Sequence, residues 1–186
     1  SGRNGGQVHV GMRRDQDWLE KRVGETDARA LWQLALDARA HLDWLVDAHD
    51  IACDLTPGYL HVDHKARYVA GTRHHVAHLQ DRYGYADIRF VDREETRALV
   101  GSAGYHGGAL DMRGGHLHAL NFALGIARAA AAAGATLHDR SHADAITRVG
   151  DRWRVTTARG QVTADRVILA CDGYLRGLEP RIEARV

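Results

Sequence analysis

Cysteine is scarce in this sequence, which contains two among its 186 residues, Cys53 and Cys171. The two lie far apart, form no C-x-x-C pair and stand beside no cluster with the spacing of zinc ligands. A disulfide framework and a structural zinc site are therefore not expected. Because free cysteines are typical of compartments that keep thiols reduced, the sequence predicts a cytoplasmic protein.

Long apolar runs are also missing. The first residues contain no apolar signal segment, and the longest weakly polar run, residues 129–135, is mostly alanine and too short to cross a bilayer. The formal net charge is +1, and basic residues are spread from Arg3 to Arg185 among acidic ones. The sequence therefore predicts neither a membrane nor a nucleic acid as a partner.

What is present is the composition of a folded globular protein, 45% hydrophobic and 26% charged. The chain opens at Ser1 inside a glycine-rich loop without an initiator methionine, and it stops at Val186 without an evident terminal element. We therefore expect an internal stretch of a longer protein.

Hydrophobic spacing and capping signals predict four helices. Apolar residues recur at three- and four-residue steps in the first of them, which predicts one buried stripe: Leu31, Leu34, Ala38, Leu42 and Leu45. Asp92 is placed to cap the third helix, with Glu95 three residues later, and Gly134 is placed to end the fourth. The predicted helices cover residues 17–49, 65–82, 92–100 and 117–133.

Strands are predicted mainly in the last third of the chain. Residues 152–157 alternate as a strand does when a core covers one of its faces. Residues 167–170 are apolar throughout, which is typical of a fully buried parallel strand. Turns are predicted at Pro57-Gly58 and Gly114-Gly115. The predicted strands and extended segments are 59–62, 105–112, 135–138, 143–149, 152–157, 161–163 and 167–170, so the fold class is mixed α/β.

Two separated segments are suited to approach a ligand. The opening Ser1-Gly2-Arg3-Asn4-Gly5-Gly6-Gln7 has three glycines, which permit positive φ and bring peptide N–H groups close to a bound group. The second segment runs Gly160-x-x-x-Ala164-Asp165-x-Val167-Ile168-x-Ala170-x-Asp172-Gly173. Small residues follow its apolar strand at the carboxyl end, where dinucleotide-binding folds hold their cofactor.

These two segments, with Gly114-Gly115-His116-x-His118 between them, resemble in order the D-amino-acid-oxidase family of FAD enzymes. The likeness runs along nearly the whole chain, and the opening heptapeptide is its sharpest part. It implies a partial FAD-binding, Rossmann-like domain with a β-meander, made of residues 1–12 and 114–186. Residues 13–113 would form a helical and β cap that binds the substrate.

By the same resemblance the cofactor is FAD, held by the opening loop, by a main-chain contact to adenine and by the turn after the apolar strand. Arginine and peptide N–H donors suit phosphate oxygens, and glycine allows close approach. The implied cofactor residues are Ser1, Gly2, Arg3, Asn4, Gly5, Gly6, Gln7, Ala143, Ala170, Cys171, Asp172 and Gly173.

The implied substrate is a small amine or amino acid. Its C–N bond would be oxidised by hydride transfer to the flavin, and the imine would then be hydrolysed. The candidates for the substrate pocket are His9, Tyr59 and His116. The sequence singles out no catalytic residue, since flavin chemistry requires the protein chiefly to bind and orient. Asp111, Asp172 and Glu179 are isolated carboxylates without a visible partner, so a hydrolase has no support.

Two alternatives stand beside this interpretation. The family's G-x-G-x-x-G fingerprint does not occur in these 186 residues, so the chain could be a noncatalytic fragment with an incomplete FAD site. The second alternative is a histidine-rich metal-binding module. It is suggested by the thirteen histidines, of which His74 and His78 share a helix face. No third ligand and no H-E-x-x-H motif accompany them. We therefore predict no metal and assign His74, His75 and His78 to a solvated helix face.

Overall fold

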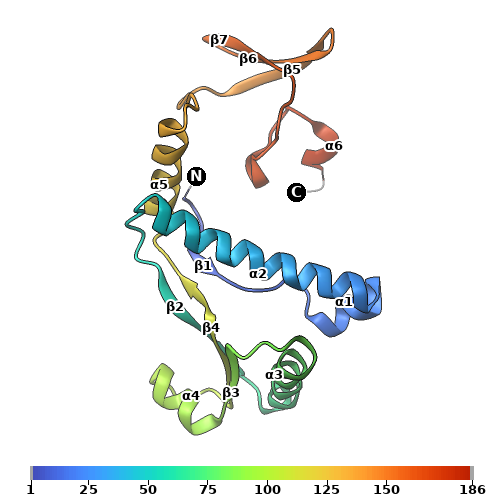
Figure 1. Cartoon of the computed structure of the whole chain (residues 1–186), viewed down its shortest axis with the longest axis vertical. Helices are drawn as coiled ribbons and strands as arrows, with labels where there is room; N and C mark the ends of the chain where they lie inside the picture. Colours follow the sequence, from blue (N-terminus) through green and yellow to red (C-terminus); the bar gives the residue numbers. More distant parts are fainter. Residues whose placement is uncertain (1, 185–186) are drawn as a thin grey trace. The chain divides into compact units, whose positions relative to one another are not determined.

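The structure, a computed structural model, describes residues 2–184. The chain divides into two compact units, Ser1–Ala135 and Thr136–Val186, which Figure 1 shows with their helices and strands. Both units contain helices and antiparallel strands, so the predicted mixed α/β class is confirmed. Among the residues described, no helix has the length and hydropathy that crossing a membrane requires.

Unit 1 is built on an antiparallel sheet whose central strand is β4 (Gly108–His116). Strand β2 (Thr56–Val62) pairs with β4 along one edge. The other edge is shared by β1 (Gln7–Val8), which pairs near the end of β4, and β3 (Ile88–Val91), which pairs near its start. Strand β4 therefore joins segments from the beginning and the middle of the chain.

Both predicted turns lie inside strands. A Cβ on Gly115 would stand 2.3 Å from the Thr56 carbonyl oxygen, and one on Gly114 would stand 2.8 Å from the Tyr59 Cβ. These glycines therefore let β4 lie close to β2 and make no turn. Pro57-Gly58 lies within β2, with Gly58 at φ +100°, at a shift of register: Pro57 pairs with Gly115 and Tyr59 with Asp111, so the extra residues of the irregularity belong to β4.

The predicted helix over 17–49 is two helices, α1 (Gln16–Val23) and α2 (Glu25–Ala48). Gly24 separates them with φ 87° and ψ 160°, a conformation open essentially to glycine alone. The predicted buried stripe is also wrong, since Leu34 is 58% exposed. The residues of α2 that are buried lie on a neighbouring face: Ala28, Trp32, Ala35 and Arg39.

The other predicted helices are confirmed, with shifted ends. Their observed bounds are η1 (Ala66–Tyr68), α3 (Val69–Tyr83), α4 (Arg93–Val100) and α5 (Ala119–Ala132). The Asp92 side chain accepts a hydrogen bond from the Glu95 N–H, as the sequence predicts for the cap of α4. Gly84 and Gly101 end α3 and α4 in the left-handed conformation.

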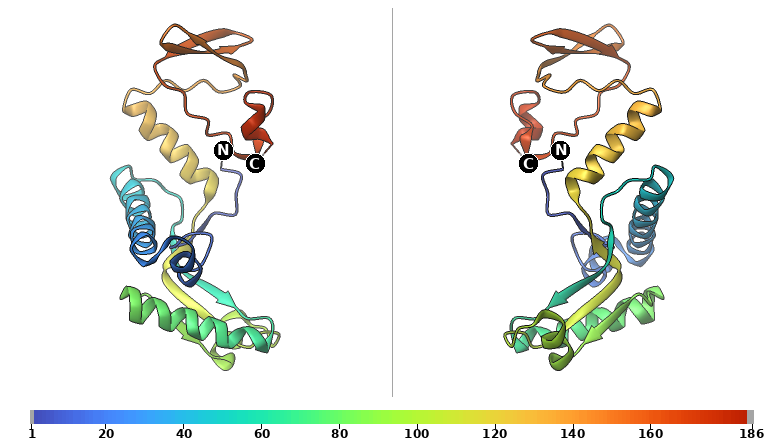
Figure 2. Two further views of the ribbon diagram at one scale, coloured as in Figure 1. Left: turned by 90° about the vertical axis from the view of Figure 1, so that its right-hand side faces the viewer. Right: turned by 90° about the vertical axis from the view of Figure 1, so that its left-hand side faces the viewer.

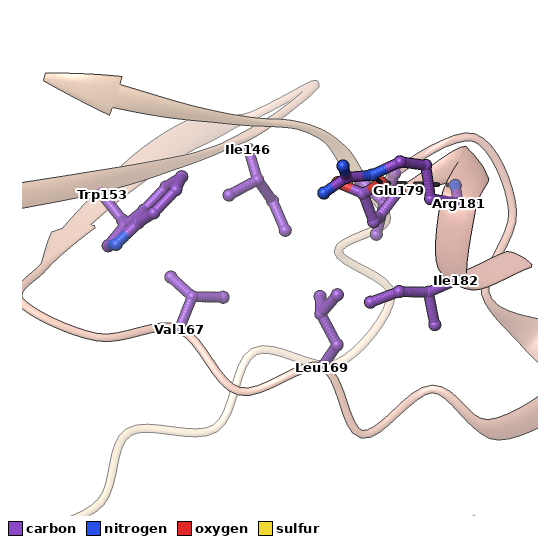
Figure 3. A pocket seen from close by; sticks show the side chains of 8 residues that line it. Ile146, Trp153, Val167, Leu169, Glu179, Arg181 and Ile182 are labelled. Carbon is purple, nitrogen blue, oxygen red and sulfur yellow. Dashed lines mark hydrogen bonds and ion pairs between the residues drawn. The ribbon is translucent and has the colours of Figure 1, made fainter.

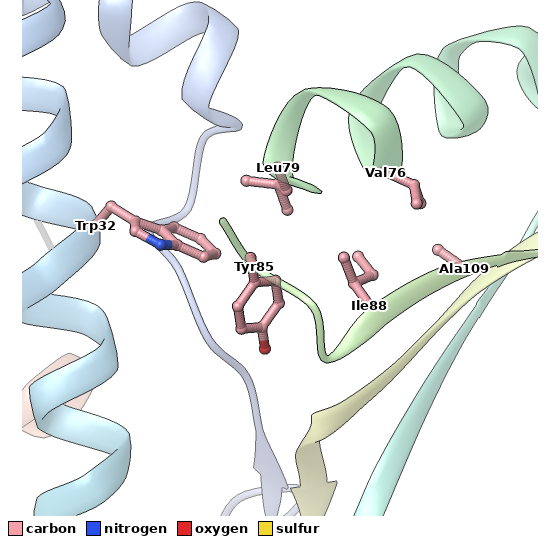
Figure 4. Packing of buried hydrophobic residues seen from close by; sticks show 6 residues of the cluster. All are labelled: Trp32, Val76, Leu79, Tyr85, Ile88 and Ala109. Atoms are coloured by element: carbon pink, nitrogen blue, oxygen red, sulfur yellow. The ribbon is translucent and has the colours of Figure 1, made fainter. Parts of the chain in front are cut away.

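The core of unit 1 lies where α2, α3 and the sheet meet. Figure 4 shows Trp32 from α2 pointing toward Leu79 of α3 and Tyr85, with Ile88 of β3 and Ala109 of β4 beyond them. The two views in Figure 2 show α3 lying along the strands that it packs against. The indole of Trp32 meets the ring of Tyr85 edge-on at 5.0 Å between centroids, a favourable aromatic geometry. This packing fixes α3 against the sheet.

Unit 2 is a three-stranded antiparallel meander followed by short helical turns. Its strands are β5 (Ala143–Val149), β6 (Arg152–Thr157) and β7 (Gly160–Ala164), which confirms the three predicted there. The turns are η2 (Asp172–Tyr174) and α6 (Pro180–Glu183). The strand predicted over 135–138 is wrong, since those residues form no strand.

The predicted buried strand over 167–170 is also wrong. The segment is not a strand, and Ile168 is 89% exposed. Val167 and Leu169 line instead a hollow of about 610 Å³, together with Ile146 and Trp153 of the meander (Figure 3). A parallel strand needs a hydrogen-bonded neighbour, and no described residue of unit 2 supplies one to this segment.

Candidate functional site

The opening loop lies against the start of α5 through its glycines. Gly2 and Gly6 adopt φ of +65° and +67°, which favour glycine. A Cβ on Gly6 would stand 2.0 Å from the Leu117 carbonyl oxygen, and one on Gly2 would stand 2.6 Å from the Leu120 Cα. The Gly6 carbonyl accepts a hydrogen bond from the Leu117 N–H at 2.8 Å. Two of the three glycines therefore serve the packing of the chain itself.

The rest of the loop is accessible to a ligand. Arg3, Gly5 and Gln7 are exposed, and a Cβ on Gly5 would meet nothing within 4 Å. The Asn4 side-chain oxygen accepts a hydrogen bond from the Gly6 N–H at 2.8 Å, so it stabilises the loop. An exposed guanidinium and an accessible peptide suit the oxygens of a pyrophosphate. Ser1, also predicted to contact FAD, lies outside the described residues.

The remaining predicted cofactor residues belong to unit 2. Ala143 begins β5, pairs with Thr157 and lines a second hollow, of about 610 Å³, on the meander. Ala170 and Gly173 are exposed, Cys171 is half-buried, and Asp172 has φ +50° at the start of η2. These features leave backbone groups accessible after the apolar segment, and the predicted cofactor contacts stay predictions.

Two of the three predicted substrate residues line one cavity. The cavity belongs to unit 1, has a volume of about 600 Å³, and is lined by residues of β2, α3 and β4. The rings of His9 and Tyr59 meet in its wall at 4.2 Å between centroids and 84° between planes. His116 does not line it. That residue is exposed in β4, opposite Gln7 and Thr56.

A buried carboxylate in the same wall was missed from the sequence. Asp63 is 2% exposed, and its Oδ1 accepts a hydrogen bond from the Thr72 hydroxyl at 2.8 Å. Its Oδ2 is buried and has no hydrogen-bond partner among the described residues. Buried polar atoms normally have a partner, so an orphaned carboxylate oxygen in a cavity wall marks a place for a donor. The alternation in His61-Val62-Asp63 was the available signal, because it puts the two polar residues on one face of a strand.

Asp111 also lines the cavity, and it is not isolated as the sequence indicated. Its Oδ1 accepts hydrogen bonds from the Tyr85 hydroxyl at 2.7 Å and from the Arg113 N–H at 2.9 Å. Burial, together with the hydrogen bond to Asp111, raises the pKa of Tyr85 well above its ordinary value. The phenol therefore stays protonated and holds this carboxylate in place.

The solvated helix face predicted for His74, His75 and His78 is right for His74, which is 66% exposed, and wrong for the other two. His78 is 12% exposed and lies against Glu20 of α1. His75 is half-buried and lines the cavity together with Asp15. Burial lowers the pKa of His75 below its ordinary value, although the charges of Asp15 and Asp17 act in the opposite direction. The cavity therefore combines three carboxylates with four histidines, and the cationic form of one of these, His75, is disfavoured. The carboxylates suit a cationic ligand.

The family can be identified by comparison with known proteins. The sequence profile of the DAO family, described as FAD dependent oxidoreductase, matches residues 1–186, the whole chain. This chain belongs to that family. The predicted resemblance is thereby confirmed, and FAD is the cofactor of the family.

Curated relatives agree with the family. The "Probable oxidoreductase OrdL" of Rhizobium meliloti (strain 1021) is 40% identical over 97% of this chain. The "Gamma-glutamylputrescine oxidoreductase" of Escherichia coli (strain K12) is 35% identical over 100% of this chain. The matches cover 42% and 43% of those relatives, so the chain spans less than half of their length.

Solved structures show the same fold. Glycine oxidase from Bacillus cereus ATCC 14579 matches 87% of this chain and 42% of its own, with a TM-score of 0.63 and 18% identity. Glycine oxidase from Geobacillus kaustophilus matches 73% of this chain and 38% of its own, with a TM-score of 0.62 and 20% identity. At these identities the likeness shows the fold alone.

Proposed function

We propose that this chain is part of a FAD-dependent enzyme that oxidises a C–N bond of a small amine or amino acid, with a gamma-glutamylputrescine-like amine as the favoured substrate. The observation that carries the proposal is the carboxylate-lined cavity of unit 1 in a chain that belongs to a FAD-dependent family over its whole length. The relative from Escherichia coli supports the choice of substrate, because its name specifies this amine.

The cofactor would be held by the opening loop, whose exposed groups fit it. The Arg3 guanidinium would neutralise a phosphate, and the peptide of Gly5 is accessible because no atom lies within 4 Å of its Cβ position. Ser1, Ala143 and residues 170–173 would add the contacts that the family resemblance implies. When bound, FAD supplies the acceptor for the hydride that leaves the carbon beside the amine nitrogen, once that nitrogen has given up its ammonium proton to water.

The substrate's ammonium would be held by the carboxylates of the cavity, first by Asp63. Its Oδ2 is buried and without a partner, so an ammonium N–H would satisfy it, and Thr72 keeps the carboxyl in one orientation. The His9 and Tyr59 rings would pack against the methylene groups of a diamine chain. An amine is thereby favoured over a purely anionic acid, which three carboxylates would repel.

The test uses protein purified at its natural length. We expect a yellow protein whose flavin absorbance is bleached anaerobically by gamma-glutamylputrescine and is bleached more slowly by glycine. A protein that takes up no flavin even when FAD is added would contradict the proposal and favour a noncatalytic role.

A matched pair of variants tests the cavity separately. Asp63→Asn should lower kcat/KM for the amine at least about 30-fold, equivalent to about 2 kcal/mol, because one partner of a buried charge pair is removed. Asp81→Asn, an equal change at an exposed position of α3, should leave kcat/KM unchanged. If the amine bleaches the flavin of wild type and the Asp63 variant has the same kcat/KM, the oxidase function stands and the assignment of the cavity as the substrate site is wrong.

A further inference from the structure

Three side chains from two helices converge away from the cavity. Asp17 lies on α1, and His74 and His78 lie one turn apart on α3. His74 Nε2 is 2.8 Å from Asp17 Oδ2, and His78 Nδ1 is 3.3 Å from Asp17 Oδ1. One nitrogen or oxygen atom from each residue lies within 4.8 Å of the others. The third ligand that the sequence did not reveal is thus Asp17, 57 positions before His74.

A second carboxylate orients one of the histidines. His78 Nε2 is 3.0 Å from Glu20 Oε1, and the same oxygen accepts a hydrogen bond from the Tyr83 hydroxyl at 2.6 Å. Glu20 lies one turn after Asp17, so both carboxylates face α3. In metal centres, a histidine ligand usually donates its other N–H to such a carboxylate, which fixes the tautomer. His78 is also 12% exposed, so its ring has a defined orientation.

The spacing of these atoms suits one shared ion. His78 Nδ1 and Asp17 Oδ1 stand 3.3 Å apart, close to the separation of two ligand atoms that each lie about 2.0–2.2 Å from a tetrahedral zinc ion. His74 supplies a second nitrogen at the same place and is 66% exposed, so the remaining coordination positions open to water.

We propose that Asp17, His74 and His78 bind one divalent transition metal ion, of which Zn²⁺ is the best match, with Glu20 holding His78 in place. Two imidazoles and one carboxylate form a borderline-soft set of the kind that zinc accepts, whereas Mg²⁺ and Ca²⁺ prefer oxygen ligands. The ion would link α1 to α3 and so stabilise the position of α3, which lines the cavity of unit 1. The site is separate from the oxidation proposed above.

The natural-length protein is first stripped of metal with a chelator. It is then titrated with Zn²⁺ in a calorimeter, and its unfolding temperature is measured with and without the ion. We expect one saturable high-affinity site that Mg²⁺ does not fill, and a rise in unfolding temperature on binding. Asp17→Asn and His74→Ala should each abolish that site or weaken it at least about 10-fold, and Glu20→Gln should weaken it by about 10- to 100-fold.

Matched controls are Asp27→Asn and His138→Ala, which change the same residue types at exposed positions and should bind Zn²⁺ as wild type does. Circular dichroism of the metal-free variants checks that each of them is folded. His74→Ala should disturb the fold least, because the His74 side chain is exposed. Co²⁺ gives a second readout through its visible absorption spectrum. The absorption of bound Co²⁺ should be weaker in His74→Ala than in wild type and unchanged in His138→Ala. The proposal is overturned if Zn²⁺ binds equally to wild type and His74→Ala, or if no saturable site exists.

Discussion

Two neighbouring glycines of the opening loop have different surroundings. Gly6 is buried, has φ +67° and lies against the Leu117 carbonyl, whereas Gly5 is exposed and has open space around it. The same substitution at the two positions therefore separates the stability of the loop from its approach to the cofactor.

We expect Gly5→Val to lower the flavin content of the natural-length protein while its unfolding temperature stays close to wild type. A β-branched side chain there would occupy the space through which a cofactor approaches the peptide. Gly6→Val should lower both quantities, since the positive φ alone costs about 1–3 kcal/mol in a residue other than glycine. The ratio of flavin to protein absorbance and a thermal melt measure the two effects. Full flavin occupancy in the Gly5 variant would show that the loop does not contact FAD.

The ion pair between Arg89 and Glu95 makes a pH-dependent contribution to stability. Both guanidinium nitrogens Nη1 and Nη2 donate to the carboxylate, at 3.0 and 2.5 Å. The hydrogen bonds from Arg89 lower the pKa of Glu95 below its ordinary value. A carboxyl with a lowered pKa stabilises the folded state above its unfolded-state pKa, and this contribution disappears as the pH falls through the folded-state value.

Glu95→Gln should therefore be slightly less stable than wild type at pH 7 and equal to it under strongly acidic conditions. The difference should be small because the pair is exposed and screened by solvent. Urea unfolding at a series of pH values measures it. A difference between the two proteins that grows as the pH falls below the ordinary carboxyl range would contradict the assigned sign.

At the scale of the elements, the break between α1 and α2 depends on Gly24. Its φ of 87° and ψ of 160° lie in a region occupied essentially by glycine. Gly24→Ala should lower the free energy of unfolding by about 1–3 kcal/mol. Gly71→Ala, in the first turn of α3 with nothing within 4 Å of the new Cβ, should raise it by about 0.4–1 kcal/mol. Denaturant unfolding compares the two, and equal destabilisation would show that a methyl group, and not the backbone conformation, causes the loss.

Elements with local signals could be predicted from the sequence, and those that depend on distant neighbours could not. Helix α4 carries its own cap at Asp92 and its own stop at Gly101, and β6 carries its own alternation. Gly114 and Gly115 form a turn signal, yet they lie in β4 because β2 approaches them closely. The apolar run 167–170 has the composition of a strand, but strand formation also requires a neighbour to pair with.

The same distinction explains the candidate site. The opening loop could be singled out because three glycines fall within seven consecutive residues. The cavity could not, since Asp63 follows β2 while His75 lies on α3 and Asp111 on β4. These residues meet only after the three elements have packed. The Asp17 cluster was missed for the same reason, because its members lie on different helices.

At the scale of the whole molecule, we expect the 186 residues produced alone to bind FAD several orders of magnitude more weakly than the natural-length protein. The sequence contains no G-x-G-x-x-G turn, which in dinucleotide folds supplies aligned N–H donors and the positive end of a helix to the pyrophosphate. The exposed Ile168 should also favour aggregation. Equilibrium dialysis with FAD beside thermal unfolding tests this, and tight stoichiometric binding by a monomer would show that the cofactor site is misplaced.

The pairing of β1 with β4 also bears on how the protein is made. Gln7 pairs with His116, so nearly all of unit 1 must leave the ribosome before β1 finds its partner. At about 5–20 residues per second, that interval lasts on the order of 5–20 s. During it the glycine-rich loop has no α5 to lie against. If the loop holds FAD as proposed, cofactor loading must wait for synthesis to pass β4 and α5, however much flavin surrounds the nascent chain.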